Sequence, residues 1–146
     1  MTSVTLVRRI KARLSIVFEA LTTPEGIGHW WGPDAGPVLA AETDVRVGGR
    51  FKVRFRMLDD SEHESSGEYL EVDRPKRLAM TWRWAGDEDS GGESHLAFDL
   101  RAIPDGTELT LTHSRLHDDD SARGHEGGWS GALDKLVRHF QRDSRA

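Results

Sequence analysis

Two histidines in the second half of the chain are the side chains best suited to acid–base chemistry. His113 continues a period-two pattern with Leu109 and Leu111, which predicts that it lies on the apolar face of a strand. His125 precedes Trp129 by four residues, which predicts that it lies on the apolar side of a helix. A neutral imidazole in either place can orient a polar group of a ligand or act as a general base. The alternative is a histidine hydrogen-bonded within the fold, and the sequence leaves both interpretations open.

The sequence adds no other catalytic constellation to these histidines. No partnered carboxylate, serine nucleophile or oxyanion-hole pattern accompanies them. The chain has no cysteine, so disulfides, a thiolate nucleophile and cysteine-bound metals are excluded. The spacing of His113, His117 and His125 around the aspartates at 118–120 matches no metal-binding motif, so we expect neither a metal nor a cofactor.

Large apolar and aromatic side chains on the predicted inward faces are candidates for lining a ligand cavity. Such cavities are mostly apolar with a few polar groups, and five tryptophans in 146 residues slightly favour one, since a large ring is rarely buried completely. A closely packed core is the alternative. With one tyrosine and the two histidines, the candidate residues are Trp30, Phe51, Phe55, Tyr69, Met80, Trp82, Trp84, Phe98, His113, His125, Trp129 and Leu133.

The adjacent residues Trp30 and Trp31 cannot both face the same way on a helix or a strand. One is expected in the core, and the other at the mouth of the cavity or on the surface. A surface tryptophan would mark a protein interface, and the sequence does not decide between these places.

A long helix near the end of the chain would position His125 and Trp129. From Trp129 onward apolar residues recur at steps of three and four, and the aspartates at 118–120 suit the positive end of a helix dipole. Residues 118–140 are therefore predicted to form an amphipathic helix.

Glycines interrupt the first half of this predicted helix. Each costs a helix ~1 kcal/mol relative to alanine. We expect close packing at Gly127, Gly128 and Gly131, with a kink or a nearby ligand as alternatives, whereas Gly124 is expected in a frayed start.

The residues before this helix predict a sheet with one apolar face. Residues 50–57 alternate between apolar and basic side chains, and the basic stripe is expected on the outer face, opposite acidic residues of the next strand. Binding of an acidic partner to this stripe is the alternative. The strand at 67–72 has an uncertain register with a possible bulge at Gly67, and residues 85–93 are expected to form a loop.

Shorter elements are predicted at the beginning of the chain. Residues 4–10 are rich in β-branched side chains and indicate a strand, and residues 14–22 repeat with a helical period. Thr23-Pro24-Glu25 is a helix-start signal, but Gly26 and Gly28 make the second helix weak.

Together these elements predict an α+β fold. A curved antiparallel sheet of about six or seven strands wraps around the long C-terminal helix, with two short helices after the first strand. The length fits one domain over residues 1–146.

The net charge of −5 and a pI near 5.8 argue against nucleic-acid and anionic-membrane binding. No apolar run is long enough for a membrane span and no signal peptide is evident, so a cytoplasmic location is expected.

Several segments resemble a known family. Phe18-Glu-Ala-Leu-Thr-Thr-Pro-Glu and Trp30-Trp-Gly-Pro are similar to the opening of START-like, birch-pollen-allergen-like (SRPBCC) domains. More narrowly, the chain resembles homologues of the activator of the heat-shock protein 90 ATPase. The further landmarks are Val47-Gly-Gly-Arg-Phe, Gly67-Glu-Tyr-Leu-Glu-Val, Arg77-Leu-Ala-Met-Thr-Trp, Gly106-Thr-Glu-Leu-Thr-Leu-Thr-His and His125-Glu-Gly-Gly-Trp.

The resemblance implies a helix-grip fold with a cavity between the sheet and the long helix, but it implies less about activity. Our first hypothesis is a domain that binds an apolar or amphipathic small molecule without chemistry. The second is a cyclase-type or hydrolase-type enzyme that uses the same cavity, with His113 or His125 as the base. The third is an interaction module that works on a chaperone or as a homodimer, through the outer strands or the paired tryptophans.

Overall fold

Seven strands and three helices follow one another in the part of the chain that the computed structural model describes, residues 2–84, 93–116 and 119–143. Most of the predicted loop at 85–93, together with His117 and Asp118, lies outside the described residues. The elements are β1 (Thr2–Ile10), α1 (Leu14–Thr22), α2 (Pro24–Ile27), β2 (Val38–Thr43), β3 (Arg50–Arg56), β4 (Glu62–Asp73), β5 (Arg77–Trp84), β6 (Ser94–Ile103), β7 (Gly106–Leu116) and α3 (Asp119–Asp143).

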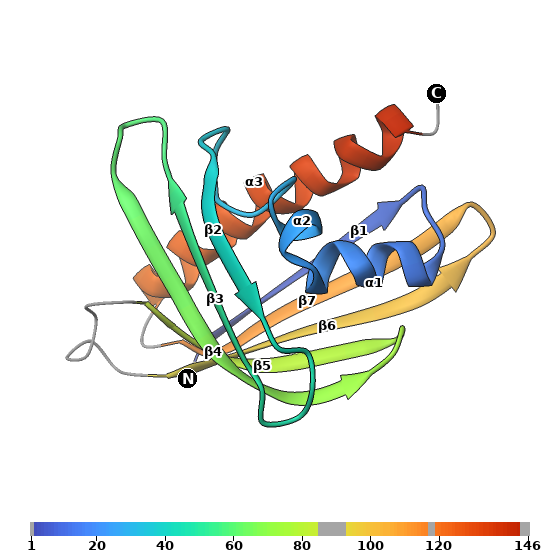
Figure 1. Cartoon of the computed structure of the whole chain (residues 1–146), viewed down its shortest axis with the longest axis horizontal. Coiled ribbons are helices and arrows are strands. Elements are labelled where there is room, and N and C mark those ends of the chain that lie inside the picture. Colours follow the sequence, from blue (N-terminus) through green and yellow to red (C-terminus); the bar gives the residue numbers. More distant parts are fainter. Residues whose placement is uncertain (1, 85–92, 117–118, 144–146) are drawn as a thin grey trace.

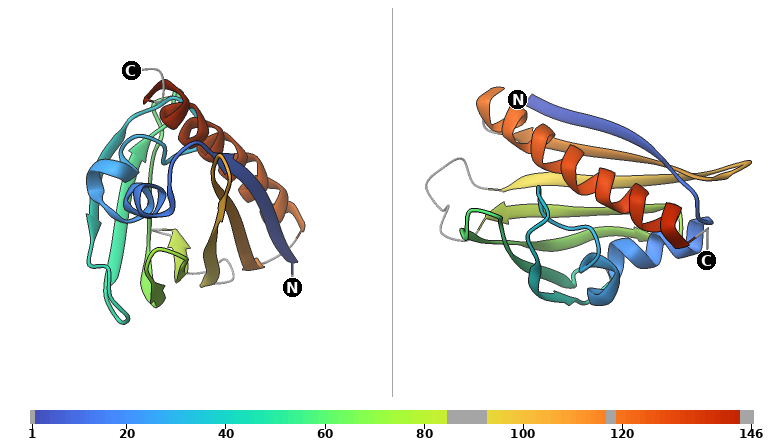
Figure 2. Two further views of the ribbon diagram at one scale, coloured as in Figure 1. Left: turned by 90° about the vertical axis from the view of Figure 1, so that its right-hand side faces the viewer. Right: turned by 90° about the horizontal axis from the view of Figure 1, so that it is seen from above.

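The strands form one antiparallel sheet in the order β1-β7-β6-β5-β4-β3-β2 (Figure 1). Seen from its end, the sheet bends into a trough, and α3 lies across the open side while α1 and α2 fill one end (Figure 2). This arrangement confirms the predicted α+β, helix-grip architecture. Among the helices of the described residues, none is long and apolar enough to cross a membrane.

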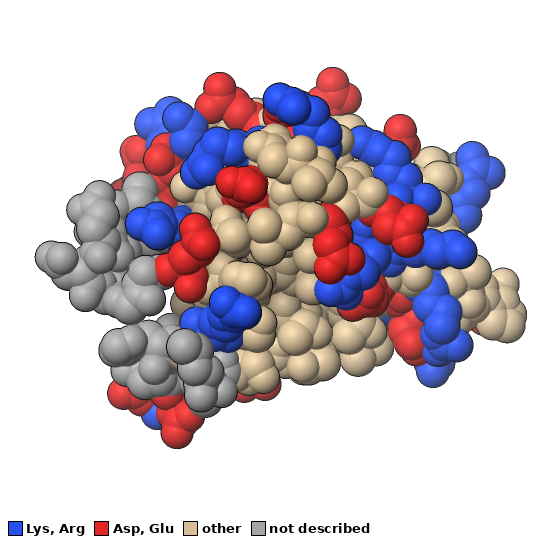
Figure 3. Space-filling model, turned by 90° about the horizontal axis from the view of Figure 1, so that it is seen from below, with Lys and Arg blue, Asp and Glu red and all other residues tan. Residues whose placement is uncertain are grey.

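The alternating pattern of β3 separates a buried face from a charged one. Phe51, Val53 and Phe55 are buried, and the basic residues between them are exposed. On the outer face Arg56 lies 3.4 Å from Glu62 of the next strand, as the sequence predicted. Such exposed pairs contribute little stability, but they keep this surface soluble. Lysine, arginine and acidic side chains are also interspersed on the side of the molecule seen in Figure 3.

The register of β4 differs from the prediction. The shift in its pairing with β5 lies between Tyr69 and Glu71, not at Gly67. Gly67 instead allows a close approach, because a Cβ atom there would overlap the carbonyl group of Thr81 on the neighbouring strand. Upstream of the bulge, alternate residues of β4 therefore face the inside of the trough.

The short helices pack closely because of one glycine. The hydroxyl of Thr23 accepts a hydrogen bond of 3.0 Å from the backbone of Gly26, which confirms the predicted helix start. A Cβ atom on Gly26 would lie 2.6 Å from the Cα atom of Ala20 in α1, so this corner requires a glycine. The indole of Trp30 then donates to the carbonyl oxygen of Ala20 at 2.8 Å and fixes the chain that leaves α2.

Helix α3 packs its apolar side into the trough, with Leu133 and Leu136 completely buried. Arg8 of β1 holds the helix from outside by hydrogen bonds to Ser130 and Asp134. The glycines of α3 differ in their surroundings. Close packing is found at Gly131, where a methyl group would overlap the carbonyl oxygen of Pro33, but nothing lies within 4 Å of a Cβ atom at Gly127.

This difference gives a matched pair of variants. Gly131→Ala is expected to lower the free energy of unfolding by about 1–3 kcal/mol, because the overlap with Pro33 outweighs the gain in helix propensity. Gly127→Ala is expected to raise it by up to ~1 kcal/mol. Urea unfolding measures both, and stabilisation by both alanines would show that α3 does not approach Pro33 closely.

Candidate functional site

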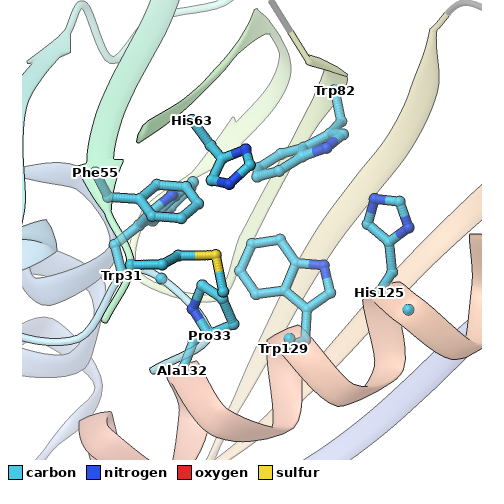
Figure 4. Close-up of a pocket in the computed structure, with 12 residues that line it drawn as sticks. Trp31, Pro33, Phe55, His63, Trp82, His125, Trp129 and Ala132 are labelled. Carbon is cyan, nitrogen blue, oxygen red and sulfur yellow. The ribbon is translucent and has the colours of Figure 1, made fainter. Parts of the chain in front are cut away.

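A pocket of about 430 Å³ lies between the first half of α3, the ends of β3, β4 and β5, and the loop after α2. Figure 4 shows Phe55, His63 and Trp82 reaching in from the sheet, opposite Trp129 and His125 on the helix. Most of the lining is apolar. The lining residues are Trp31, Gly32, Pro33, Phe55, Met57, His63, Trp82, Gly124, His125, Gly128, Trp129 and Ala132.

Three indole rings form the inner wall of the pocket. Trp31 and Trp82 stack with ring centroids 5.6 Å apart and an angle of 25° between the ring planes. Trp129 stands steeply against both, with centroid distances of 5.5 Å to Trp31 and 5.1 Å to Trp82. Stacked and edge-to-face contacts of this kind hold aromatic rings in defined orientations. The wall is thus a rigid aromatic surface assembled from three distant segments of the chain.

A hydrogen-bonded chain behind this wall fixes Trp129. Its indole N–H donates to Nδ1 of His113 at 3.0 Å, and Nε2 of His113 lies 2.7 Å from the hydroxyl of Ser94. Because Nδ1 accepts, the proton of the neutral ring is on Nε2 and is donated to Ser94. Both ring nitrogens are therefore engaged, and His113 acts as the hydrogen-bonded histidine of the fold and not as a base that faces the pocket.

The protonation state of His113 follows from its position. The side chain is completely buried. Burial, helped by the nearby His125, lowers the pKa of His113 to about 3. A proton on Nδ1 would also place two N–H donors, from His113 and Trp129, against each other. His113 is therefore neutral at physiological pH.

The polar side chains on the pocket wall are the imidazoles of His63 and His125. His125 is half-buried, and its ring stands edge-to-face with His113 at a centroid distance of 4.6 Å. His63, at the beginning of β4, packs against the ring of Phe55 at 5.6 Å. Among the described residues, no group of three or more histidine or acidic side chains is arranged to hold a metal ion.

The loop that carries Trp31 is tied to its surroundings from two sides. The ammonium of Lys135 in α3 donates to the carbonyl oxygens of Trp31 and Asp34, at 3.1 and 2.5 Å. The Asp34 carboxylate accepts from the backbone of Leu58 at 3.1 Å, in the turn between β3 and β4. Burial lowers the pKa of Lys135, against the opposing effect of Asp34. The loop thus connects two walls of the pocket.

The structure brings together only some of the predicted cavity residues. Phe55, Trp82, His125 and Trp129 line the pocket. The side chain of Trp84 lies outside the described residues. The others are packed in the core and do not line the pocket: Trp30, Phe51, Tyr69, Met80, Phe98, His113 and Leu133.

Sequence reasoning missed lining residues that tertiary contacts select. Trp30 and Trp31 are both buried, but Trp31 is the one on the pocket wall. His63 lies an even number of residues before Tyr69 and so shares its face of β4. The alternation along β4 is therefore a signal in the sequence that could have indicated His63, but the register of this strand is uncertain from the sequence.

A sheet trough closed by one long C-terminal helix, with an apolar pocket between them, defines the helix-grip class of START-like proteins. The sequence pattern of the family described as "Activator of Hsp90 ATPase homolog 1-like protein" matches residues 11–141. The chain belongs to this family.

Solved structures of bacterial proteins show the same fold over nearly the whole chain. A Silicibacter pomeroyi protein named AHSA1 is 28% identical with a TM-score of 0.83, and the match covers 97% of this chain and 99% of the other. A Mesorhizobium loti protein is 25% identical with a TM-score of 0.76, and the match covers 97% of this chain and 98% of the other. A Nitrosomonas europaea protein is 21% identical with a TM-score of 0.81, and the match covers 99% of this chain and 97% of the other. The comparison with curated proteins found no match.

The buried neutral His113 makes a prediction about acid stability. The unfolded chain takes up a proton at this residue near pH 6.5, but the folded protein does so only near pH 3. The free energy of unfolding should therefore fall as the pH drops through 6.5, by up to ~1.4 kcal/mol per pH unit from this residue. Measured by urea unfolding at about pH 7 and about pH 4.5, the wild type should lose about 2.5 kcal/mol more than His113→Gln. Equal losses would contradict a neutral, buried His113.

Proposed function

We propose that this domain binds a small, mainly apolar molecule in the pocket between α3 and the sheet. The observation that carries the proposal is the wall of three indoles, Trp31, Trp82 and Trp129, around a volume of about 430 Å³. Ligand sites typically have volumes of about 300–1,000 Å³ and combine apolar walls with a few polar groups. His63 and His125 supply such groups here.

The hydrogen bonds that hold the indole rings of the pocket wall favour binding. Rings that are already fixed before a ligand arrives lose little conformational entropy when it binds. Trp129 is held by His113, and the loop of Trp31 is held by Lys135. The two imidazoles enter this proposal as hydrogen-bonding groups. They are also the side chains that acid–base chemistry on a bound molecule would use.

A glycine on the helical wall allows the proposal to be tested without disturbing the core. Gly124 lines the pocket, and nothing lies within 4 Å of a Cβ atom built on it. Gly124→Leu should therefore extend a side chain into the opening and weaken binding of the neutral dye N-phenyl-1-naphthylamine at least about tenfold, a change of 1.4 kcal/mol. The increase in dye fluorescence on titration with protein gives the dissociation constant.

The matched control is Gly127→Leu. Gly127 is exposed on the same helix, has equally open surroundings and is not a lining residue. Both variants should gain similar helix stability, so only the effect on the pocket differs. An unchanged dissociation constant in Gly124→Leu, or no binding of the dye by the wild type, would overturn the proposed site.

A further inference from the structure

Ring side chains dominate the wall of the pocket, unlike the core beneath it. The described lining residues include no leucine, isoleucine or valine, and their aliphatic side chains are those of Met57, Ala132 and Pro33. The core, in contrast, buries many branched aliphatic side chains, such as Leu96 and Leu111. The pocket is therefore not an open extension of the aliphatic core. The lining residues that carry aromatic rings are Trp31, Phe55, His63, Trp82, His125 and Trp129.

The three indole rings of the wall lie in two steeply different planes. The planes of Trp31 and Trp82 are 25° apart, whereas the plane of Trp129 makes angles of 80° and 63° with them. Aromatic rings attract one another most in offset-stacked and edge-to-face arrangements. A flat ring that lies against one of these indoles therefore meets another at a steep angle, and both contacts are favourable.

A saturated or flexible molecule gains less from the same wall. An alkyl chain makes van der Waals and hydrophobic contacts, but it has no aromatic face or edge to complement the indoles. Its rotatable bonds must also be fixed on binding, which costs conformational entropy. The wall itself is held before binding, since Trp129 donates to His113 and the carbonyl oxygen of Trp31 accepts from Lys135. A rigid aromatic ligand thus leaves little to be ordered on either side.

We propose that the pocket selects flat aromatic molecules over alkyl chains and saturated rings of similar size. The ring of the ligand packs in the corner between Trp129 and the stacked pair Trp31 and Trp82, and Phe55 borders it on the β3 side (Figure 4). Trp31 and Phe55 are then residues that determine specificity. This inference rests on the proposed function and names the ligand class of the same site.

The test compares neutral primary alcohols that have the same number of carbon atoms. 2-Naphthalenemethanol is flat and aromatic, decahydro-2-naphthalenemethanol is its saturated counterpart, and 1-undecanol is a flexible chain. Titration of ¹⁵N-labelled protein, followed by the indole N–H signals, gives each dissociation constant. Burial of apolar surface alone favours the saturated probes, because they are the more apolar molecules. The wild type should nevertheless bind the naphthalene probe at least about fivefold more tightly than either of the others.

Substitutions at Trp31 separate aromatic character from size. Trp31→Leu and Trp31→Phe both remove part of the indole volume, but only Trp31→Phe keeps an aromatic ring on the wall. The preference for the naphthalene probe over its saturated counterpart should fall at least about threefold in Trp31→Leu. Trp31→Phe should retain most of the preference, because the smaller ring still offers a face and an edge.

Two phenylalanines provide a second pair of variants that leaves all three indoles in place. Phe55 lines the pocket, whereas Phe140 is buried in the second half of α3 and is not a lining residue. Phe55→Leu should lower the preference at least about twofold. Phe140→Leu is the matched control, since it removes a buried ring of the core and should leave the preference unchanged.

The outcomes separate this inference from the proposed function. Equal or tighter binding of the saturated probes by the wild type overturns the aromatic selection but leaves the pocket as a binding site. The same conclusion follows if the preference persists in both Trp31→Leu and Phe55→Leu, or if Phe140→Leu lowers it as much as they do. No shift of the indole signals with any probe overturns both proposals. The dispersion of the amide signals verifies that each variant is folded, and the ratio of two dissociation constants in the same variant cancels small changes in stability.

Discussion

The buried contact between Trp129 and His113 links the long helix to the sheet at the point where the pocket begins. A buried indole N–H needs an acceptor, and the strand residue His113 supplies one at 3.0 Å. This bond orients the indole that forms the central wall, and it requires His113 to stay neutral. His113, one of the two histidines suited to acid–base chemistry, is thus part of the scaffold. The polar side chains on the pocket wall are His63 of β4 and His125 of α3.

The pocket exists because the two halves of α3 carry side chains of different size. In the second half Leu133, Leu136 and Phe140 fill the trough. In the first half Gly124 and Gly128 face the pocket, so the helix leaves a space that the sheet does not fill. The loop of Trp31 closes this space from the side, because Gly131 lets Pro33 approach the helix and Lys135 binds the loop carbonyl oxygens. Small residues therefore contribute to this site as much as aromatic ones.

Membership of the family accounts for the fold, but the site must be judged from its own residues, since one fold carries many functions. In this chain the lining combines three indoles with two imidazoles. Nε2 of one imidazole, that of His63, lies 3.0 Å from the hydroxyl oxygen of Ser61. These are features of the side chains, and they distinguish this pocket from a generic apolar cavity of the same shape.

The sequence by itself determined the elements and most of the architecture. The alternation in β3, the helical repeat of α1, the start of α2 at Thr23 and the apolar stripe of α3 were all predictable, because each pattern depends on neighbouring residues. Only the tertiary structure decided that Trp31 and His63 reach the pocket and that His113 does not. Those positions depend on the bulge after Tyr69 and on contacts such as Lys135 with Trp31, which join residues about a hundred positions apart. Local periodicity indicates which side of an element is buried, but the packing of distant segments decides which buried side chains border an open space.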